Sequence, residues 1–124
     1  MSHISKIELE VKDLTALDQA CHRLGLKFFE GQKTFRWYGE SASCDHAIRI
    51  PEAQYEIGVV RQESGYALTC DFFDPGIEKA IGPNGGRLKQ AYAIAKTRAE
   101  ARKKNYTVIE RKTKTGIRLQ VRLG

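Results

Sequence analysis

Residues 55–71 read YEIGVVRQESGYALTCD, and this stretch decides the fold. Two apolar-rich runs, Tyr55–Gln62 and Tyr66–Asp74, flank the three residues Glu63-Ser64-Gly65. A short connection that contains glycine between two such runs is the common signal of a β-hairpin. Hairpin-length connections join antiparallel strands, so we expect an antiparallel sheet in the middle of the chain.

Toward the N-terminus, the periodicity predicts two further kinds of element. Residues 4–11 alternate between apolar and polar side chains, as a half-buried strand does. Residues 14–24 carry apolar side chains at helical spacing, with Thr15 as the expected N-cap. Leu26–Phe35 and Ala47–Ile50 are candidate strands that lead into the hairpin.

Toward the C-terminus, residues 74–86 are rich in glycine and proline, and we expect a mobile loop there. The segment Arg87–Lys104 then predicts a long helix, because its apolar residues form one stripe at 100° per residue. This stripe consists of Leu88, Ala91, Tyr92, Ala95 and Ala99. Two strands, Tyr106–Arg111 and Gly116–Leu123, complete the chain.

The predicted order is therefore β-α-β-β-β-β-α-β-β. Two helices on one face of an antiparallel sheet make a two-layer α+β fold. The length of 124 residues suits a single domain, residues 1–124. The side chains that we expect to be buried include Leu17, Leu24, Leu68, Leu88, Tyr92, Leu119 and Val121.

The composition predicts a cytoplasmic protein that does not enter membranes. No run approaches the roughly 18 apolar residues of a membrane helix, and the first residues lack the apolar core of a signal peptide. The three cysteines, Cys21, Cys44 and Cys70, are too few and odd in number for a disulfide framework. We expect Cys44, which lies in a polar segment, to be the most reactive of the three.

Charge is distributed very unevenly along the chain. Residues 1–86 carry 9 Lys or Arg and 13 Asp or Glu, whereas residues 87–124 carry 12 and 2. Clustered cations of this kind are the electrostatic signature of phosphate binding. Three interpretations remain open: a polyanion surface, a surface for a protein partner, and a solvated basic face.

Most of these cations lack a local acidic partner, because Glu100 is the sole acid of the long helix. If the first and last strands are neighbours, Glu8 and Glu10 offset two or three charges of the last strands. The residues that we expect to bind nucleic acid or an acidic protein partner are Arg87, Lys89, Lys96, Arg98, Arg102, Lys103, Lys104, Arg118 and Arg122.

Two other features bear on binding. Gly85 and Gly86 precede the long helix, where free backbone N–H groups can bind an anion; the alternative is a sharp turn capped by Asn84. Exposed aromatic residues would favour single-stranded nucleic acid by base stacking. Phe35 and Trp37 share a strand face and are better explained as core residues.

Catalytic and metal sites are not predicted. The best metal candidate is Cys44-Asp45-His46, joined by His3, Cys21, His22 or Cys70, but zinc prefers two closely spaced ligand pairs. Cys44 beside His46 is also the single thiol–base pair within reach, and nothing resembles an oxyanion hole. We therefore expect no metal, no cofactor and no catalytic residue.

Several short motifs occur in a familiar order along nearly the whole chain. They are Met1-Ser2-His3, Leu24-Gly25, Tyr55-Glu56-Ile57-Gly58 with Arg61, Gly65-Tyr66-Ala67-Leu68 with Asp71, Leu88-Lys89-Gln90-Ala91-Tyr92-Ala93, and Gly116-Ile117-Arg118-Leu119-Gln120-Val121. By these motifs the chain resembles the conserved hypothetical chloroplast reading frame 35 family, also called domain of unknown function 1257. The resemblance is to a bacterial or bacteriophage member of that family. The resemblance implies no reaction, and it implies an accessory or adaptor role beside an AAA-type ATPase.

The function that we predict is a non-enzymatic accessory or binding module. Its basic C-terminal third contacts nucleic acid or an acidic protein partner. The alternatives are an adaptor for an AAA-type ATPase that does not bind nucleic acid, and a small enzyme with an unrecognised site.

Overall fold

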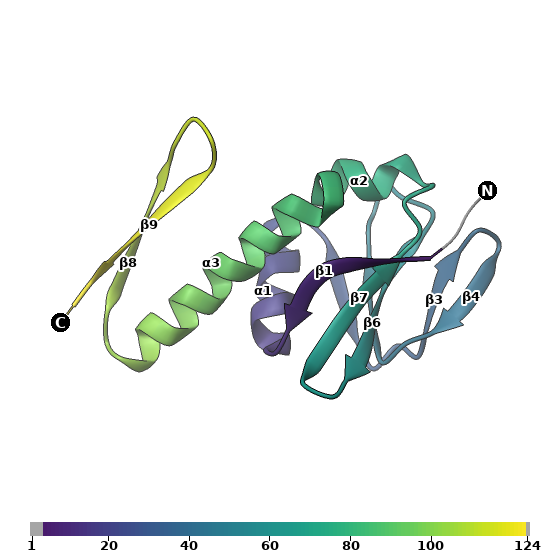
Figure 1. Ribbon diagram of the computed structural model, residues 1–124, viewed down its shortest axis with the longest axis horizontal. Coiled ribbons are helices and arrows are strands. Elements are labelled where there is room, and N and C mark those ends of the chain that lie inside the picture. The colour runs from purple at the N-terminus through teal and green to yellow at the C-terminus, as the bar shows by residue number, and fades with distance from the viewer. Residues whose placement is uncertain (1–3, 124) are drawn as a thin grey trace.

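The computed structural model describes residues 4–123 and is built on a five-stranded antiparallel sheet (Figure 1). The strands are β1 (Ser5–Val11), β2 (Lys27–Glu30), β5 (His46–Arg49), β6 (Glu56–Gln62) and β7 (Gly65–Cys70). Their order in the sheet is β1-β7-β6-β5-β2. The predicted hairpin is confirmed, since β6 pairs with β7 and Gln62 lies opposite Gly65.

Three helices cover one face of this sheet: α1 (Leu14–Arg23), α2 (Pro75–Ile81) and α3 (Gly86–Lys103). Their apolar side chains join those of the sheet in one core, which includes Leu17, Ile57, Leu68 and Leu88. The predicted α+β class, with an antiparallel sheet and helices on one face, is thereby confirmed. The N-cap of α1 is Asp13, not Thr15, because the Asp13 carboxylate accepts a hydrogen bond from the backbone N–H of Ala16.

The opposite face of the sheet is partly covered by a small hairpin. Its strands are β3 (Thr34–Trp37) and β4 (Glu40–Ser43), joined by Tyr38 and Gly39 with the positive φ values that a type I′ turn needs. The predicted strand 26–35 is thus divided between β2 and β3. Phe35 is buried against the sheet, as expected, and its ring lies directly over Gly58.

The segment expected to be a mobile loop contains the helix α2 and the short 3-10 helix η1 (Pro83–Gly85). Asp74 caps α2, because its carboxylate accepts a hydrogen bond from Gly76 N–H at 2.9 Å. Pro75 stands at the first helical position, where its fixed φ favours helix initiation. The sequence signals that we interpreted as a loop are therefore those of helix ends.

The last two strands form a separate hairpin, β8 (Thr107–Lys112) and β9 (Ile117–Arg122). Figure 1 shows α3 leading away from the five-stranded sheet to this hairpin at the far end of the molecule. β1 pairs with β7, and β9 pairs with β8, so the first and last strands are not neighbours and Glu8 and Glu10 do not face the cations of β9. Of the seven side chains expected to be buried, Leu17, Leu68, Leu88 and Tyr92 are buried. Leu24 and Leu119 are only partly buried, and Val121 is 43% exposed.

The helix α3 explains why the hairpin lies apart from the sheet. Leu88, Ala91, Tyr92 and Ala95 belong to the main core, whereas Ile94 and Ala101 are buried on a second side of the helix. At 100° per residue these two groups point in directions about 120° apart. The second apolar side needs its own cover, and the hairpin provides it.

Within residues 4–123, no helix has both the length and the apolar character needed to cross a membrane.

Candidate nucleic-acid interface

The register of the C-terminal hairpin divides its side chains between two faces. Residues directly opposite each other in an antiparallel pair project from the same face. Arg111 pairs with Arg118, and Thr107 pairs with Arg122. We call this side the outward face; it consists of Thr107, Ile109, Arg111, Arg118, Gln120 and Arg122. The inward face consists of Val108, Glu110, Lys112, Ile117, Leu119 and Val121.

Glu110 fixes the inward face against the helices. Its carboxylate accepts hydrogen bonds from Arg23 of α1, at 2.6 Å, and from Arg98 of α3, through Nε at 2.9 Å. The hydrogen bonds from Arg23 and Arg98 lower the pKa of Glu110 to about 2. Two elements that are far apart in the sequence thereby hold one residue of the hairpin.

Further contacts align the hairpin with α3. The backbone N–H of Tyr106 donates to the carbonyl of Ala101 at 2.8 Å, which turns the chain at the end of the helix. At the other end of the hairpin, a Cβ on Gly116 would lie 3.0 Å from the Gln90 side chain. The hairpin therefore runs back along α3, with its outward face directed away from the helix.

Like charges face each other on the outward face. Arg111 and Arg118 are directly opposite in register, and both are exposed. The ion pairs formed among residues 4–123 do not include Arg111, Arg118 or Arg122. Like charges at such positions destabilise a strand pair, by up to about 1 kcal/mol. An anion bound at this face would remove that repulsion.

Three of the nine cations predicted for binding make contacts within the protein instead. Arg98 binds Glu110, and the guanidinium of Arg87 donates to the carbonyl of Lys79. Lys96 lies 3.9 Å from carboxylate oxygens of both Asp13 and Glu100. These contacts stabilise the packing of α3 and leave the three side chains less available to a ligand.

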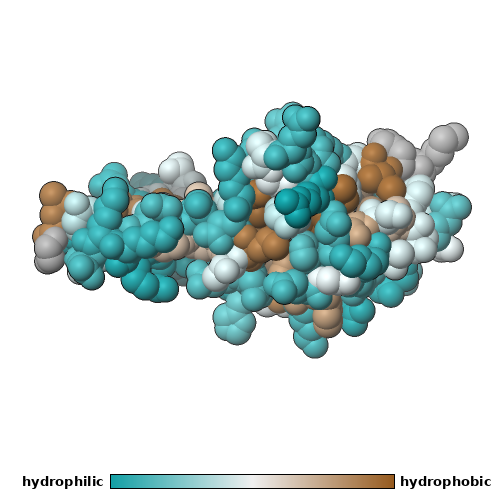
Figure 2. Space-filling view, turned by 90° about the horizontal axis from the view of Figure 1, so that it is seen from below, coloured by the Kyte–Doolittle hydropathy of each residue, from teal (hydrophilic) through white to brown (hydrophobic). Residues whose placement is uncertain are grey.

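The other predicted cations lie near the hairpin, with one exception. Arg102, Lys103 and Lys104 are exposed at the end of α3, where the hairpin begins, and Arg118 and Arg122 lie on its outward face. Lys89 is half-buried nearer the start of the helix. Figure 2 shows that, on the face seen from below, the narrow end formed by the hairpin and the end of α3 is mostly hydrophilic.

The residues predicted to bind did not include Arg111, Lys112 and Lys114. Arg111 shares the outward face with Arg118, whereas Lys114 lies in the turn between the two strands. The sequence did contain the information needed to place Arg111 beside Arg118, because a turn at residues 114–116 fixes which residues of the two strands lie opposite each other.

The two glycines before α3 have a structural explanation. Gly85 has a φ of 74°, and a Cβ there would lie 2.9 Å from the Ile7 side chain. Gly86 has a helical φ of −57° and open space around it. Close packing of η1 on β1 thus accounts for Gly85 without a bound anion.

The cysteines are in surroundings that suppress their reactivity. All three are buried, which raises the pKa of Cys44 and raises the pKa values of Cys21 and Cys70 to about 12. The Cys44 thiol donates to the carbonyl of Gln32, and His46 Nδ1 accepts from Gly31 N–H. His46 is therefore not positioned as the base of a Cys44 nucleophile.

No group of three or more metal-ligating side chains converges among residues 4–123. The Met1-Ser2-His3 motif lies outside the described residues, and with it His3, a candidate metal ligand.

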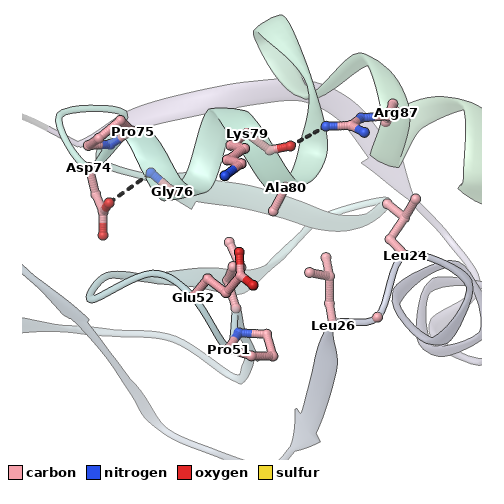
Figure 3. A pocket seen from close by; sticks show the side chains of 12 residues that line it. Leu24, Leu26, Pro51, Glu52, Asp74, Pro75, Gly76, Lys79, Ala80 and Arg87 are labelled. Carbon is pink, nitrogen blue, oxygen red and sulfur yellow. Dashed lines mark hydrogen bonds between the residues drawn. The ribbon is translucent and has the colours of Figure 1, made fainter.

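A groove of about 580 Å³ lies between α2, the end of α1 and the loop that follows β5 (Figure 3). Its apolar residues include Leu24 and Leu26, and its charged residues include Glu52, Lys79 and Arg87. Asp74 at its edge accepts hydrogen bonds from the backbone N–H groups of residues 54, 55 and 76. The contacts drawn in Figure 3, Asp74 to Gly76 and Arg87 to Lys79, thus hold α2 in place.

The fold and its exposed arginines define a small α+β protein with a projecting basic hairpin. The family described as Protein of unknown function (DUF1257) matches residues 20–121, and the chain belongs to that family. The matched range includes all of α3 and the hairpin as far as Val121. No curated protein matches the chain. No solved structure matches it either.

Proposed function

We propose that this protein is a non-enzymatic accessory module that binds nucleic acid through the outward face of its C-terminal hairpin. The observation that carries the proposal is the pairing of Arg111 with Arg118, beside Arg122, on an exposed face. A stable protein has no structural use for this repulsion, whereas a phosphate backbone neutralises it.

The positions of other exposed cations near the hairpin support the outward face as the binding surface. Arg102, Lys103 and Lys104 lie at the base of the hairpin, and Lys114 lies in the turn at its tip. Cations at both ends of the outward face extend it into a surface long enough for several phosphates. Since phosphate contacts fix orientation and supply most of the affinity, such a surface suits a polyanion.

We further propose that the chain is a bacterial or bacteriophage member of the chloroplast reading frame 35 family, on the motifs quoted above. Its three free cysteines suit the reducing cytoplasm. An adaptor for an AAA-type ATPase, without nucleic-acid binding, is the alternative that the following experiment separates from our proposal.

The experiment measures fluorescence anisotropy of labelled oligonucleotides at two salt concentrations. Two triple variants with the same change of charge are compared: R111E/R118E/R122E, on the outward face, and K6E/K27E/K33E, on exposed sites of the main body. Each lost phosphate contact lowers the steepness of log K against log salt by about 0.9. We expect the arginine variant to lose about three such contacts and the lysine variant to bind nearly as the wild type does.

Two results would contradict the proposal. Absence of binding by the wild-type protein at low salt, where electrostatic attraction is least screened, favours the adaptor. Equal weakening in both triple variants indicates a general effect of net charge and removes the outward face as the site.

A further inference from the structure

We infer that the nucleic acid is double-stranded DNA and that the hairpin enters its major groove with the outward face toward the base edges. This inference rests on the proposed function and names the partner of the same surface. Three properties of the hairpin carry it: its shape, the spacing and chemistry of its side chains, and the position of the exposed aromatic residues.

The shape of the hairpin fits the major groove. It is a separate two-stranded ribbon that lies beyond α3, apart from the main sheet (Figure 1). The major groove of B-form DNA is about 12 Å wide and about 8.5 Å deep, and it admits a two-stranded β-ribbon. The inward face is fixed to α1 and α3 through Glu110, so the outward face is the one that can approach the base pairs.

Spacing and chemistry along β9 suit base recognition. Arg118, Gln120 and Arg122 occupy successive positions on the outward face. Same-face side chains on a strand repeat about every 6.8 Å, which corresponds to roughly two base-pair steps of about 3.4 Å each. Arginine recognises guanine through O6 and N7, and glutamine recognises adenine.

The exposed aromatic residues lie elsewhere. Proteins that bind single strands stack bases on aromatic side chains. None of the six residues of the outward face is aromatic. The exposed aromatics Tyr38 and Phe73 contact each other edge to face and belong to the β3–β4 turn and the β7–α2 connection, at the opposite end of the molecule.

Duplex RNA fits less well than duplex DNA. The major groove of an A-form helix is deep and narrow, and protein side chains do not reach its base edges. The outward face would then contact the phosphates alone. We therefore expect the order of affinity to be duplex DNA, then duplex RNA and single strands.

The experiment compares one sequence as duplex DNA, single-stranded DNA and duplex RNA, by fluorescence anisotropy with the full chain. We expect duplex DNA to bind at least about tenfold more tightly than the other two, as groove contacts contribute beyond the backbone. A second duplex carries deazaguanine, which lacks the N7 acceptor. It should bind the wild-type protein several-fold more weakly, and Arg118→Ala should abolish this difference.

Gln120→Ala provides a variant without a change of charge. It should leave the salt dependence unchanged while relaxing base preference among bound duplexes selected from a random library. Circular dichroism of the variant shows that it remains folded.

The outcomes separate the two proposals. If none of the nucleic acids binds, the proposed function fails. If single strands or duplex RNA bind as tightly as duplex DNA, or if deazaguanine has no effect, nucleic-acid binding stands and the major-groove inference is overturned.

Discussion

Replacing Glu110 by glutamine tests how the hairpin is held, because this carboxylate joins it to both α1 and α3. Glutamine keeps the size of the side chain and removes its charge. We expect the hairpin to open locally more often, while the five-stranded sheet keeps its stability. Every proposal for the outward face depends on this anchor, since it determines which face of the hairpin is available.

The free energy lost on replacing Glu110 can be estimated from how exposed the three side chains are. A hydrogen bond to a charged group contributes about 1.5–3 kcal/mol, whereas an exposed ion pair contributes about 0–1 kcal/mol. The Glu110 side chain is 22% exposed, and those of Arg23 and Arg98 are 39% and 41% exposed. The three side chains are neither buried nor fully exposed, so each contact should contribute a free energy between these two cases. We assign about 1 kcal/mol to the contact with each arginine and about 2 kcal/mol to the anchor as a whole. At 1.4 kcal/mol per factor of ten, local opening should increase about 30-fold.

The assay is native-state amide hydrogen exchange, which reports local opening. Protection of the amides in β8 and β9 should fall about 30-fold, and protection in β6 and β7 should not change. Glu100→Gln, on α3, is the matched control, because Glu100 is 53% exposed and its contact with Lys96 is long, at 3.9 Å. Unchanged protection of the hairpin in the Glu110 variant would refute our account of the anchor.

The same residue predicts a dependence on pH. The two arginines lower the pKa of Glu110 to about 2, below the value of about 4.3 for a free glutamate. The anchor is therefore fully present above the pKa of the unfolded chain and is lost as the pH falls toward about 2. NMR titration of the Leu119 methyl groups, opposite Glu110, should give a midpoint near 2; a midpoint near 4 would contradict the structure.

Four other substitutions or reactions have defined expectations. Gly58→Ala should lower the free energy of unfolding in urea by about 1–3 kcal/mol, because its methyl group would overlap the ring of Phe35. Tyr92→Phe should lower it by about 1–3 kcal/mol, since the Tyr92 hydroxyl accepts hydrogen bonds from two backbone N–H groups after β1. Arg118→Thr should increase amide protection in the hairpin up to about fivefold by relieving repulsion, while weakening nucleic-acid binding. Brief iodoacetamide treatment with mass-spectrometric mapping should modify Cys44 first, because it is 7% exposed and the other two cysteines are fully buried.

Local patterns in the sequence predicted the elements whose neighbours are close in the chain. The hairpin of β6 and β7 has a short glycine-containing turn between apolar runs, and α1 has both helical spacing and a glycine after its end. The small hairpin of β3 and β4 was not predicted. Its turn places Tyr38 at a φ of 36°, a conformation for which a tyrosine gives no sequence signal.

The packing of elements that are far apart in the sequence could not be predicted in the same way. An alternating strand such as β9 fits equally well into a central sheet or onto a helix, since both positions cover one apolar face. The distinguishing signal was in α3, where Ile94 and Ala101 lie about 120° around the helix from the predicted stripe. A helix with a single apolar stripe needs one partner layer, whereas α3 needs two.

The candidate site depended on this placement. Nine cations were predicted from charge alone, and the fold divides them according to whether a carboxylate or backbone carbonyl within the protein binds the side chain. Arg98 meets Glu110 because the hairpin returns along α3, whereas Arg118 meets Arg111 because the turn sets the register. Neither neighbour can be deduced from composition, because each follows from the position of a turn, the first at the end of α3 and the second between β8 and β9.

The two faces of the hairpin together explain why an exposed row of arginines is tolerated. A two-stranded hairpin is marginally stable by itself, and the inward apolar residues here are only partly covered. Glu110 therefore provides much of the energy that holds the hairpin in place, and it does so on the inward face. The outward face contributes repulsion, and its arginines form no compensating ion pair within the described residues. A ligand that neutralises Arg111 and Arg118 would stabilise the bound hairpin by mass action, so binding and ordering of the hairpin should be coupled.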